Sequence, residues 1–222
     1  MSTIEKGSDG FSKKYWDENY KDPESMDGIG NLVHHLGYIK NLFAIEYVDI
    51  SSVIDFGFGL GHFLEAFNRE FLPYKVMGIE PSAEVFDQFS KKKLQAVKST
   101  KVKLEKIDLV SWAKTQYKGW DRFDFGICTS VLQYLTSEEI QVVMPVMAAR
   151  VKYLYLSVPT DVELDRQREE VEFFDRYAIR RSRGEYLKLI SPYFTFISAR
   201  VLESKTFFSE KDSSFTDLLF RF

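Results

Sequence analysis

The stretch VIDFGFGLGHFLEAF at residues 53–67 constrains the fold more than any other part of the sequence. A run of apolar residues ends at Asp55, a loop carries Gly57, Gly59 and Gly61, and an amphipathic helical pattern follows at once. Glycines let the backbone pass close to a ligand and turn sharply into a helix, whose first N–H groups have no intrahelical partner. The order of strand, glycine loop and helix therefore predicts a ligand-binding βα unit. A tight βα turn with nothing bound is the alternative interpretation.

The spacing of these glycines separates the loop from two common phosphate-binding loops. The dinucleotide fingerprint G-x-G-x-x-G would place its third glycine at position 62, where this chain has His62. No Lys-Ser or Lys-Thr pair follows the loop, so it is not a Walker-type loop. The glycine spacing therefore matches neither the dinucleotide-binding loop nor the Walker-type loop.

From residue 51 onward, apolar runs alternate with amphipathic helical patterns. The pattern predicts five strands, at residues 51–56, 75–80, 102–107, 123–130 and 153–158. It predicts helices between and after them, at residues 62–72, 81–94, 109–116, 137–151 and 184–191. Two further strands are expected to form a closing hairpin, at residues 194–204 and 214–222. We therefore predict an α/β fold: a doubly wound, seven-stranded, mostly parallel sheet with an antiparallel C-terminal hairpin strand.

Residues 1–50 do not follow this alternation. An aromatic and charged stretch, KYWDENY, is followed by a turn-rich stretch at 21–30 and then by a helical pattern running to about Tyr47. We predict an N-terminal arm and helical cap over residues 1–50 and one cofactor-binding domain over residues 51–222. The charged stretch at 160–185 has few periodic apolar positions, and we interpret it as a lid.

The composition of the 222 residues excludes several functions. The net charge is −3, so no nucleic-acid partner is expected, because binding a polyphosphate needs a basic face. One cysteine, Cys128, and three scattered histidines give no metal-ligand spacing, so no metal is expected. No apolar run approaches the ~20 residues that span a bilayer, and the start of the chain has no apolar signal region. We expect a cytoplasmic monomer or homodimer that acts on a small molecule and has no membrane partner.

Two acidic residues stand at the ends of predicted strands. Glu80 ends the second strand, beside the position expected for the glycine loop, where its carboxylate can accept from both hydroxyls of a ribose. A carboxylate at the start of a helix is the alternative. Asp108 follows the third strand, where it can accept from an adenine amino group while Leu109 covers the ring. An N-cap is the alternative for Asp108.

Together these motifs resemble those of class I S-adenosylmethionine-dependent methyltransferases of the small-molecule type. The resemblance covers about residues 50–160 and includes the stretch TSVLQYL after the fourth strand. It implies S-adenosylmethionine as cofactor, held by Asp55, Gly57, Gly59, Gly61, Glu80, Pro81, Asp108, Leu109, Ser130 and Val131. A second, shorter resemblance, of YWDENY to a W-D-x-x-Y segment, implies that Trp16 helps to cover the cofactor.

The reaction implied by this resemblance is methyl transfer to a small molecule by in-line displacement. The family often reads L-E-H-L where this chain has Leu132 to Leu135 with no charged residue, so the catalytic residue is unknown. Candidates for a general base are His34, His35, Tyr134 and Tyr177, although packing or a surface position is the alternative for the two histidines. The arginines within 176–183 either bind an anionic substrate or form surface ion pairs. A non-catalytic module that binds the cofactor or its product, and another adenosyl-cofactor enzyme on the same fold, are the alternative functions.

Overall fold

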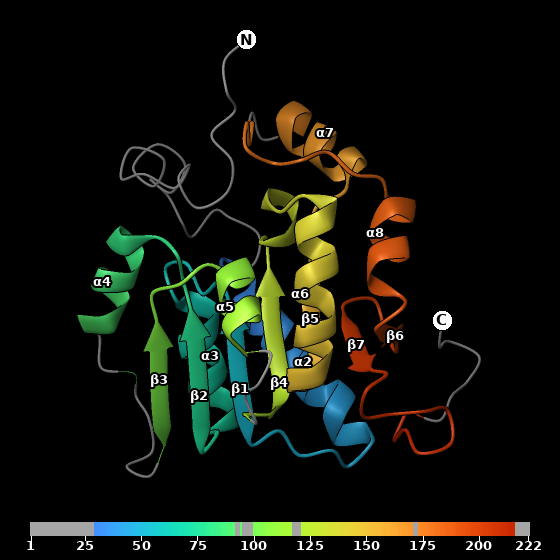
Figure 1. Cartoon of the computed structure of the whole chain (residues 1–222). Coiled ribbons are helices and arrows are strands. Elements are labelled where there is room, and N and C mark those ends of the chain that lie inside the picture. Colours follow the sequence, from blue (N-terminus) through green and yellow to red (C-terminus); the bar gives the residue numbers. More distant parts are fainter. Residues whose placement is uncertain (1–28, 92–93, 95–99, 117–120, 171–172, 216–222) are drawn as a thin grey trace.

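A seven-stranded mixed sheet forms the centre of the molecule, in the order β3-β2-β1-β4-β5-β7-β6 (Figure 1). The computed structural model describes residues 29–91, 94, 100–116, 121–170 and 173–215. Five strands run parallel: β1 Ser52–Phe56, β2 Lys75–Ile79, β3 Lys101–Glu105, β4 Phe123–Thr129 and β5 Val151–Ser157. The chain winds outward from β1 in one direction and then returns to β4 on its other side. This reversal creates the crevice at the carboxyl ends of β1 and β4 where ligands bind in such sheets.

The closing hairpin lies within residues 194–204. β6 Phe194–Phe196 pairs with β7 Val201–Ser204, and β7 runs antiparallel to both β6 and β5. The predicted antiparallel strand is confirmed, but the prediction of one strand over 194–204 is wrong, because the chain reverses at residues 198–200. The N–H groups of Ile197 and Ser198 both donate to the Val201 carbonyl and close this turn. Of the strand predicted at 214–222, residues 214–215 are not in a strand and the remainder lies outside the described residues.

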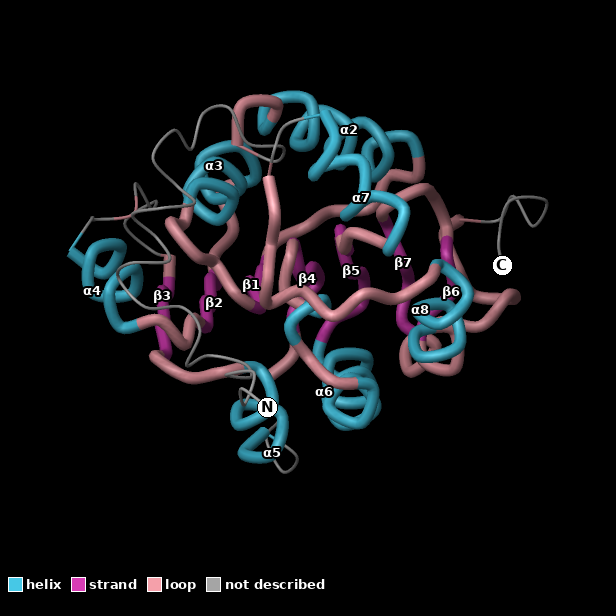
Figure 2. Tube along the Cα trace, turned by 90° about the horizontal axis from the view of Figure 1, so that it is seen from above, coloured by secondary structure: helices cyan, strands magenta, loops and turns pink. Residues whose placement is uncertain are grey.

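Helices cover both faces of the sheet, as the alternating pattern predicted (Figure 2). On one face lie α2 Leu32–Ile45 and α3 His62–Phe71, and their core also takes Phe89 from α4 Ala83–Lys91. On the other face lie α5 Leu109–Gln116, α6 Ser137–Arg150 and α8 Arg183–Ile190. The helix predicted in the N-terminal cap is α2, and it buries Leu36, Ile39 and Phe43 against the sheet face. It is therefore part of the core.

Two features that the sequence patterns did not predict lie near the carboxyl edge of the sheet. A 3₁₀ turn, η3 Leu132–Tyr134, follows β4. The helix α7 Asp161–Glu170 follows β5 and lies at the upper end of the molecule in Figure 1. No residue of α7 is buried, so the helix has no apolar stripe from which its period could be predicted.

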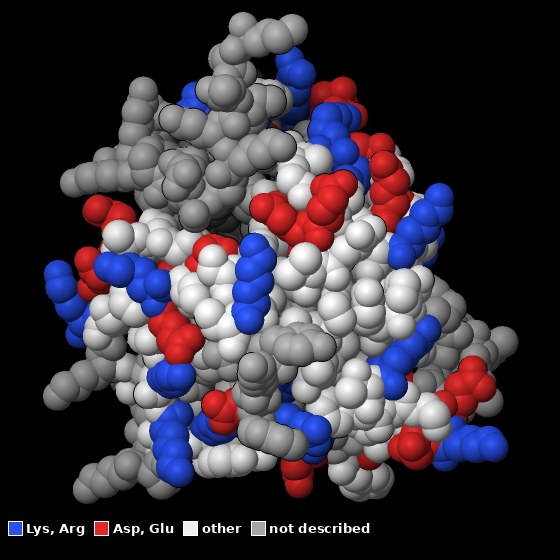
Figure 3. All heavy atoms as spheres, in the orientation of Figure 1, with Lys and Arg blue, Asp and Glu red and all other residues white. Residues whose placement is uncertain are grey.

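The surface agrees with the charge balance of the sequence. On the face drawn in Figure 3, acidic and basic side chains are interspersed. Among the helices of the described residues, none has the length and apolar character needed to cross a membrane.

Candidate functional site

The three glycines of the loop after β1 all have a positive φ. Gly57 has a φ of 133°, Gly59 of 51° and Gly61 of 80°. Residues with a side chain rarely adopt these conformations, so the sequence needs glycine at each position. The N–H of Gly61 donates to the Phe58 carbonyl at 2.7 Å, and α3 begins at the next residue. The loop therefore turns the chain from the sheet into the start of a helix within a few residues.

Close packing also requires glycine at two of these positions. A Cβ atom on Gly57 would lie 2.6 Å from Cγ2 of Val131. A Cβ atom on Gly61 would lie 2.1 Å from the ring of Phe89 in α4. The structure thus brings Val131, from the end of β4, against the loop that follows β1. These are two of the regions predicted to form one site.

Glu80 lies directly beside the glycine loop. Its Oε2 accepts from the Gly59 N–H at 2.9 Å, and its Oε1 accepts from the Ser82 N–H at 2.8 Å. The residue is 5% exposed, and burial raises the pKa of its carboxyl to about 7 although both backbone hydrogen bonds lower it. Each carboxylate oxygen keeps a further lone pair that can accept from a ligand hydroxyl. The alternative role at the start of α4 also has support, since Ser82 immediately precedes that helix.

Asp55 provides an unsatisfied polar atom at the same place. The residue is 2% exposed, and its Oδ1 has no hydrogen-bond partner within the part of the chain that the structure describes. Burial, and secondarily the charge of Glu80, raises the pKa of this carboxyl well above its usual range. Buried carboxyl oxygens without a partner are rare in native proteins, because losing the contact with water costs free energy. A ligand that brings a donor to this loop would satisfy Oδ1, so the residues present fit an adenosyl cofactor with its amino and hydroxyl groups.

The structure gives Asp108 and Leu109, which follow β3, structural roles. Oδ1 of Asp108 accepts from the Ser111 N–H at 2.8 Å, which is the N-cap alternative. Leu109, the first residue of α5, is buried in the core between that helix and the sheet. Binding of an adenine ring by Asp108 and Leu109 remains a prediction. Pro81, between Glu80 and Ser82, is half-buried and shows no ligand role of its own.

The segment after β4 has a strained start. Ser130 has a φ of 55°, in the left-handed region that side chains disfavour, and its N–H donates to the Ser157 carbonyl at 2.8 Å. Such conformations gather at binding sites, where the surroundings hold them. Further along, Gln133 is 3% exposed, and none of the described residues hydrogen-bonds its Oε1. No local sequence pattern gives Gln133 a role, since neither its burial nor the state of its Oε1 is visible in such a pattern.

The four candidate bases do not form one group. His34 is exposed on α2. The Nε2 of His35 lies 3.0 Å from Oδ1 of Asn31, which can only accept, so Nε2 donates there and Nδ1 accepts from the hydroxyl of Tyr155. This arrangement fixes the tautomer of His35 and fastens α2 to β5. It favours the packed alternative for His35.

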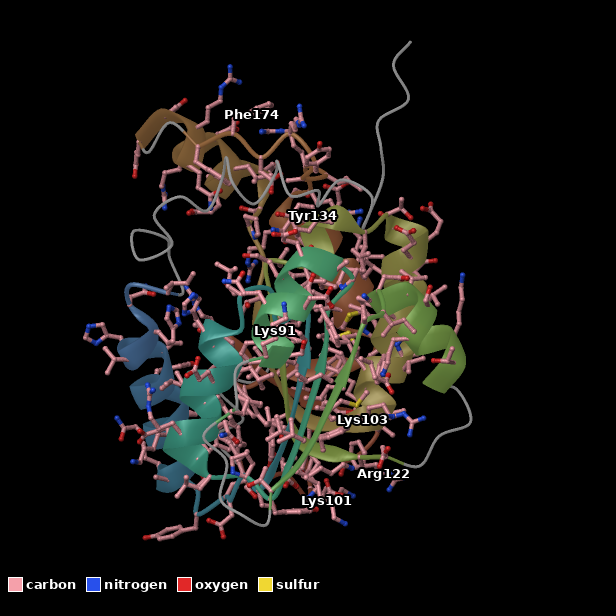
Figure 4. All side chains as sticks on the ribbon, turned by 90° about the vertical axis from the view of Figure 1, so that its left-hand side faces the viewer. Lys91, Lys101, Lys103, Arg122, Tyr134 and Phe174 are labelled. Carbon is pink, nitrogen blue, oxygen red and sulfur yellow. The ribbon has the colours of Figure 1, made fainter. Side chains whose placement is uncertain are left out.

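The two tyrosine candidates lie close to one carboxylate. The Tyr134 hydroxyl donates to Oδ2 of Asp175 at 2.6 Å, and the Tyr177 N–H donates to Oδ1 of Asp175 at 3.1 Å. The hydroxyl of Tyr177 accepts from the guanidinium of Arg176 at 2.6 Å. In Figure 4, Tyr134 lies at the upper end of the molecule, below the exposed Phe174. Trp16, the remaining candidate, lies outside the described residues.

The arginines after α7 are largely engaged within the protein. The guanidinium of Arg180 bonds Oδ2 of Asp165 at 2.7 Å on the surface. Arg181 is 4% exposed and donates to main-chain carbonyls and a hydroxyl. The prediction that Arg180 and Arg181 bind an anionic substrate is therefore not supported, and the ion-pair alternative holds for Arg180. Within the part of the chain that the structure describes, no three His, Cys, Asp or Glu side chains gather as metal ligands.

No protein-family model matches the sequence, and no curated protein matches it. Several solved structures share the fold. The plantazolicin methyltransferase BpumL, in complex with SAH, has a TM-score of 0.63 at 14% identity, covering 82% of this chain and 70% of BpumL. Magnesium protoporphyrin IX methyltransferase (ChlM) from Synechocystis PCC 6803 has a TM-score of 0.55 at 14% identity, covering 91% of this chain and 99% of ChlM. A SAM-dependent methyltransferase from Archaeoglobus fulgidus has a TM-score of 0.57 at 17% identity, covering 83% of this chain and 76% of that protein.

These similarities establish the fold. The chain has the Rossmann-like fold of class I S-adenosylmethionine-dependent methyltransferases, as the resemblance of its motifs predicted. At 14–17% identity, fold does not decide the methyl acceptor, because unrelated substrates are served by loops grafted on one scaffold.

Proposed function

We propose that this protein is an S-adenosylmethionine-dependent methyltransferase that acts on a small molecule. The observation that carries the proposal is the Glu80 carboxylate, buried at the carboxyl end of β2 and bonded to the Gly59 N–H of the positive-φ glycine loop. Oδ1 of Asp55, in β1 just before this loop, has no hydrogen-bond partner among the described residues and adds a second acceptor for a ligand. Support from the fold is that its solved counterparts are methyltransferases, some of them with SAM or SAH bound.

The roles proposed for the residues follow from their places at the carboxyl edge. Glu80 accepts from the ribose hydroxyls, and the glycine loop lets the methionine part approach the backbone. Asp108 and Leu109 bind the adenine, while Ser130 and Val131 close the pocket against the glycine loop. These assignments carry over the family resemblance to the positions described above.

When bound, S-adenosylmethionine supplies a sulfonium methyl group that an acceptor atom displaces in line. The protein's contribution to such a reaction is orientation and exclusion of water, and orientation can lower a barrier by ~7–11 kcal/mol. A general base is required only where the acceptor atom keeps its proton at neutral pH. Of the candidates, Tyr134 is held by Asp175 near the end of β4, whereas His35 is bonded between Asn31 and Tyr155.

A second candidate function is a non-catalytic module that binds the cofactor or its product. The observation that favours it is that His35, Tyr134 and Tyr177, three of the candidate bases, are each hydrogen-bonded to another residue of the protein. In the described residues, none of these three is left open as a general base for an acceptor. Methyl transfer to an acceptor that is already ionised would not need one. Turnover therefore separates the two functions.

The decisive experiment is calorimetric titration of the full chain with S-adenosylhomocysteine and, separately, with NADP. We expect micromolar affinity for the first ligand and none for the second, because a carboxylate at the ribose position repels a 2′-phosphate. Tight NADP binding with no response to S-adenosylhomocysteine would refute the proposal. Incubation with methyl-labelled cofactor and a pooled small-molecule extract then distinguishes the functions: label transfer indicates the enzyme, and binding without transfer indicates the module.

A further inference from the structure

Arg181 is a buried cation whose guanidinium spans both ends of the turn after β4. It donates to the Leu132 carbonyl at 3.4 Å, to the Leu135 carbonyl, and to the Ser137 hydroxyl at 3.4 Å. Among the described residues it forms no ion pair, and its guanidinium lies over the ring of Tyr186 at 5.6 Å. A buried guanidinium is costly unless its donors are satisfied, so its position is set by the carbonyls that it binds.

Residues 173–182, which we call the strap, are fastened along this turn at two further points. The Ile179 N–H donates to the Gln133 carbonyl at 2.7 Å. The hydroxyl of Tyr134 donates to Asp175 of the strap at 2.6 Å. Figure 1 shows the strap passing from α7 to α8 across the upper end of α6. The strap thus contacts η3 along its whole length, and Arg181 is the buried residue at one end of this contact.

The turn that Arg181 spans continues directly from the wall of the candidate cofactor site. Val131, which precedes η3, packs closely on Gly57. A Cβ atom added to Gly57 would lie 2.6 Å from Cγ2 of Val131. Ser130 has a φ of 55°, a conformation that persists only where neighbouring structure holds it. The Tyr134 and Leu135 N–H groups donate to the Val131 and Leu132 carbonyls and give the turn its own bonds.

We infer that Arg181 is a positioning residue that holds residues 130–135 against the glycine loop and so couples the strap to the affinity of the cofactor site. The inference rests on the proposed function for its binding readout. Without the guanidinium, the Leu132 and Leu135 carbonyls and the Ser137 hydroxyl each lose one donor, and the strap loses its buried anchor. The Leu132 carbonyl keeps only the Leu135 N–H as a donor among the described residues. The turn then opens, and Val131 no longer closes the site opposite Gly57.

The neighbouring Arg180 provides a matched control, because it has the same side chain but is exposed. Among the described residues its guanidinium bonds only the surface Asp165 and the Asp161 carbonyl. Arg181→Met, Arg181→Lys and Arg180→Met are compared as full-length proteins. Calorimetry with S-adenosylhomocysteine gives the Kd at a temperature where each variant is folded. Hydrogen exchange gives the protection of residues 130–136, with α3, residues 62–71, as the internal reference.

We expect Arg181→Met to raise the Kd at least tenfold and to increase exchange in residues 130–136 but not in α3. Arg181→Lys should restore part of both, since an ammonium can still donate to one or two of the carbonyls. Arg180→Met should change neither by more than twofold. Unchanged affinity and unchanged exchange in residues 130–136 of Arg181→Met overturn the inference. An increase in exchange that is as large in α3 as in residues 130–136 overturns it as well.

Two further outcomes are also decisive. If Arg181→Met does not fold, Arg181→Lys is tested alone, and wild-type affinity and exchange in that variant overturn the inference. If the wild-type protein does not bind S-adenosylhomocysteine, the proposed function fails, while local exchange in residues 130–136 still decides whether Arg181 positions the turn.

Discussion

The backbone N–H of Gly59 donates to Oε2 of Glu80 at 2.9 Å, which ties the middle of the glycine loop to the end of β2. The same carboxylate accepts from the Ser82 N–H at the start of α4. One side chain therefore stabilises two neighbouring pieces of backbone and still has lone pairs for a ligand. Changes at Glu80 are expected to affect the shape of the loop as well as the binding of a ribose.

Replacing Glu80 should weaken cofactor binding. Hydrogen bonds to a charged group contribute ~1.5–3 kcal/mol each, and less in competition with water, so Glu80→Ala should raise the Kd for S-adenosylhomocysteine by roughly 10- to 100-fold. Glu84→Ala is the control, because Glu84 is exposed on α4. Calorimetry measures both variants. An unchanged Kd in Glu80→Ala would place the ribose elsewhere.

The affinity for S-adenosylhomocysteine should depend on pH. Burial raises the pKa of Glu80 to about 7, and the ionised form is the one that accepts from two hydroxyls. Affinity should therefore increase about tenfold from pH 6 to pH 8 and level off above. Titrations in buffers of different ionisation enthalpy should show proton release at pH 6. A flat profile in the wild-type protein would mean that Glu80 does not contact the ligand in its ionised form.

The stability of the ligand-free protein should change in the opposite direction with pH. Burial raises the pKa of both Asp55 and Glu80 in the folded state, so folded protein retains protons that the unfolded chain releases. Their contribution to the free energy of unfolding is present below the unfolded pKa values and is lost as pH rises through the folded ones. Urea unfolding at pH 5 and pH 8 should show this loss, and it should be smaller in Asp55→Asn. Equal losses in both proteins would contradict the buried position of the Asp55 carboxyl.

Two alanine substitutions should have opposite effects on stability. Gly61 has a φ of 80° and lies against the ring of Phe89, so Gly61→Ala should lower the free energy of unfolding by about 2 kcal/mol or more. Gly37 lies inside α2 with open space at its Cβ position, so Gly37→Ala should raise it by about 0.5–1 kcal/mol. Thermal or urea unfolding measures both. A stable Gly61→Ala variant would mean that Phe89 and the loop move aside easily.

The parts of the fold that could be predicted from sequence are those with a local periodic pattern. The strand that ends at the glycine loop, the helix starting at His62 and α5 over residues 109–116 all follow from such patterns. The reversal at residues 198–200 could not be predicted, because the turn contains neither glycine nor proline and apolar residues continue on both sides. α7 could not be predicted either, since it buries no side chain.

The candidate site shows the same division. The sequence predicted that Gly57, Glu80 and Val131 meet, because parallel strands place their carboxyl ends at one edge. It could not predict that Arg181 is buried, since its partners are main-chain carbonyls that carry no sequence signal. Nor could it predict the bond between His35 and Tyr155, which joins residues 120 positions apart.

The position of β7 between β5 and β6 affects the order in which the chain can fold during synthesis. One edge of β5 has no strand beside it until residues 201–204 have left the ribosome. The residues along β5 from Tyr153 to Leu156 are buried and apolar in the finished sheet. An unpaired apolar edge is a template for pairing with other chains, and domains fold from the N-terminus during synthesis. Translation must therefore proceed through the closing hairpin before the nascent protein is protected against association.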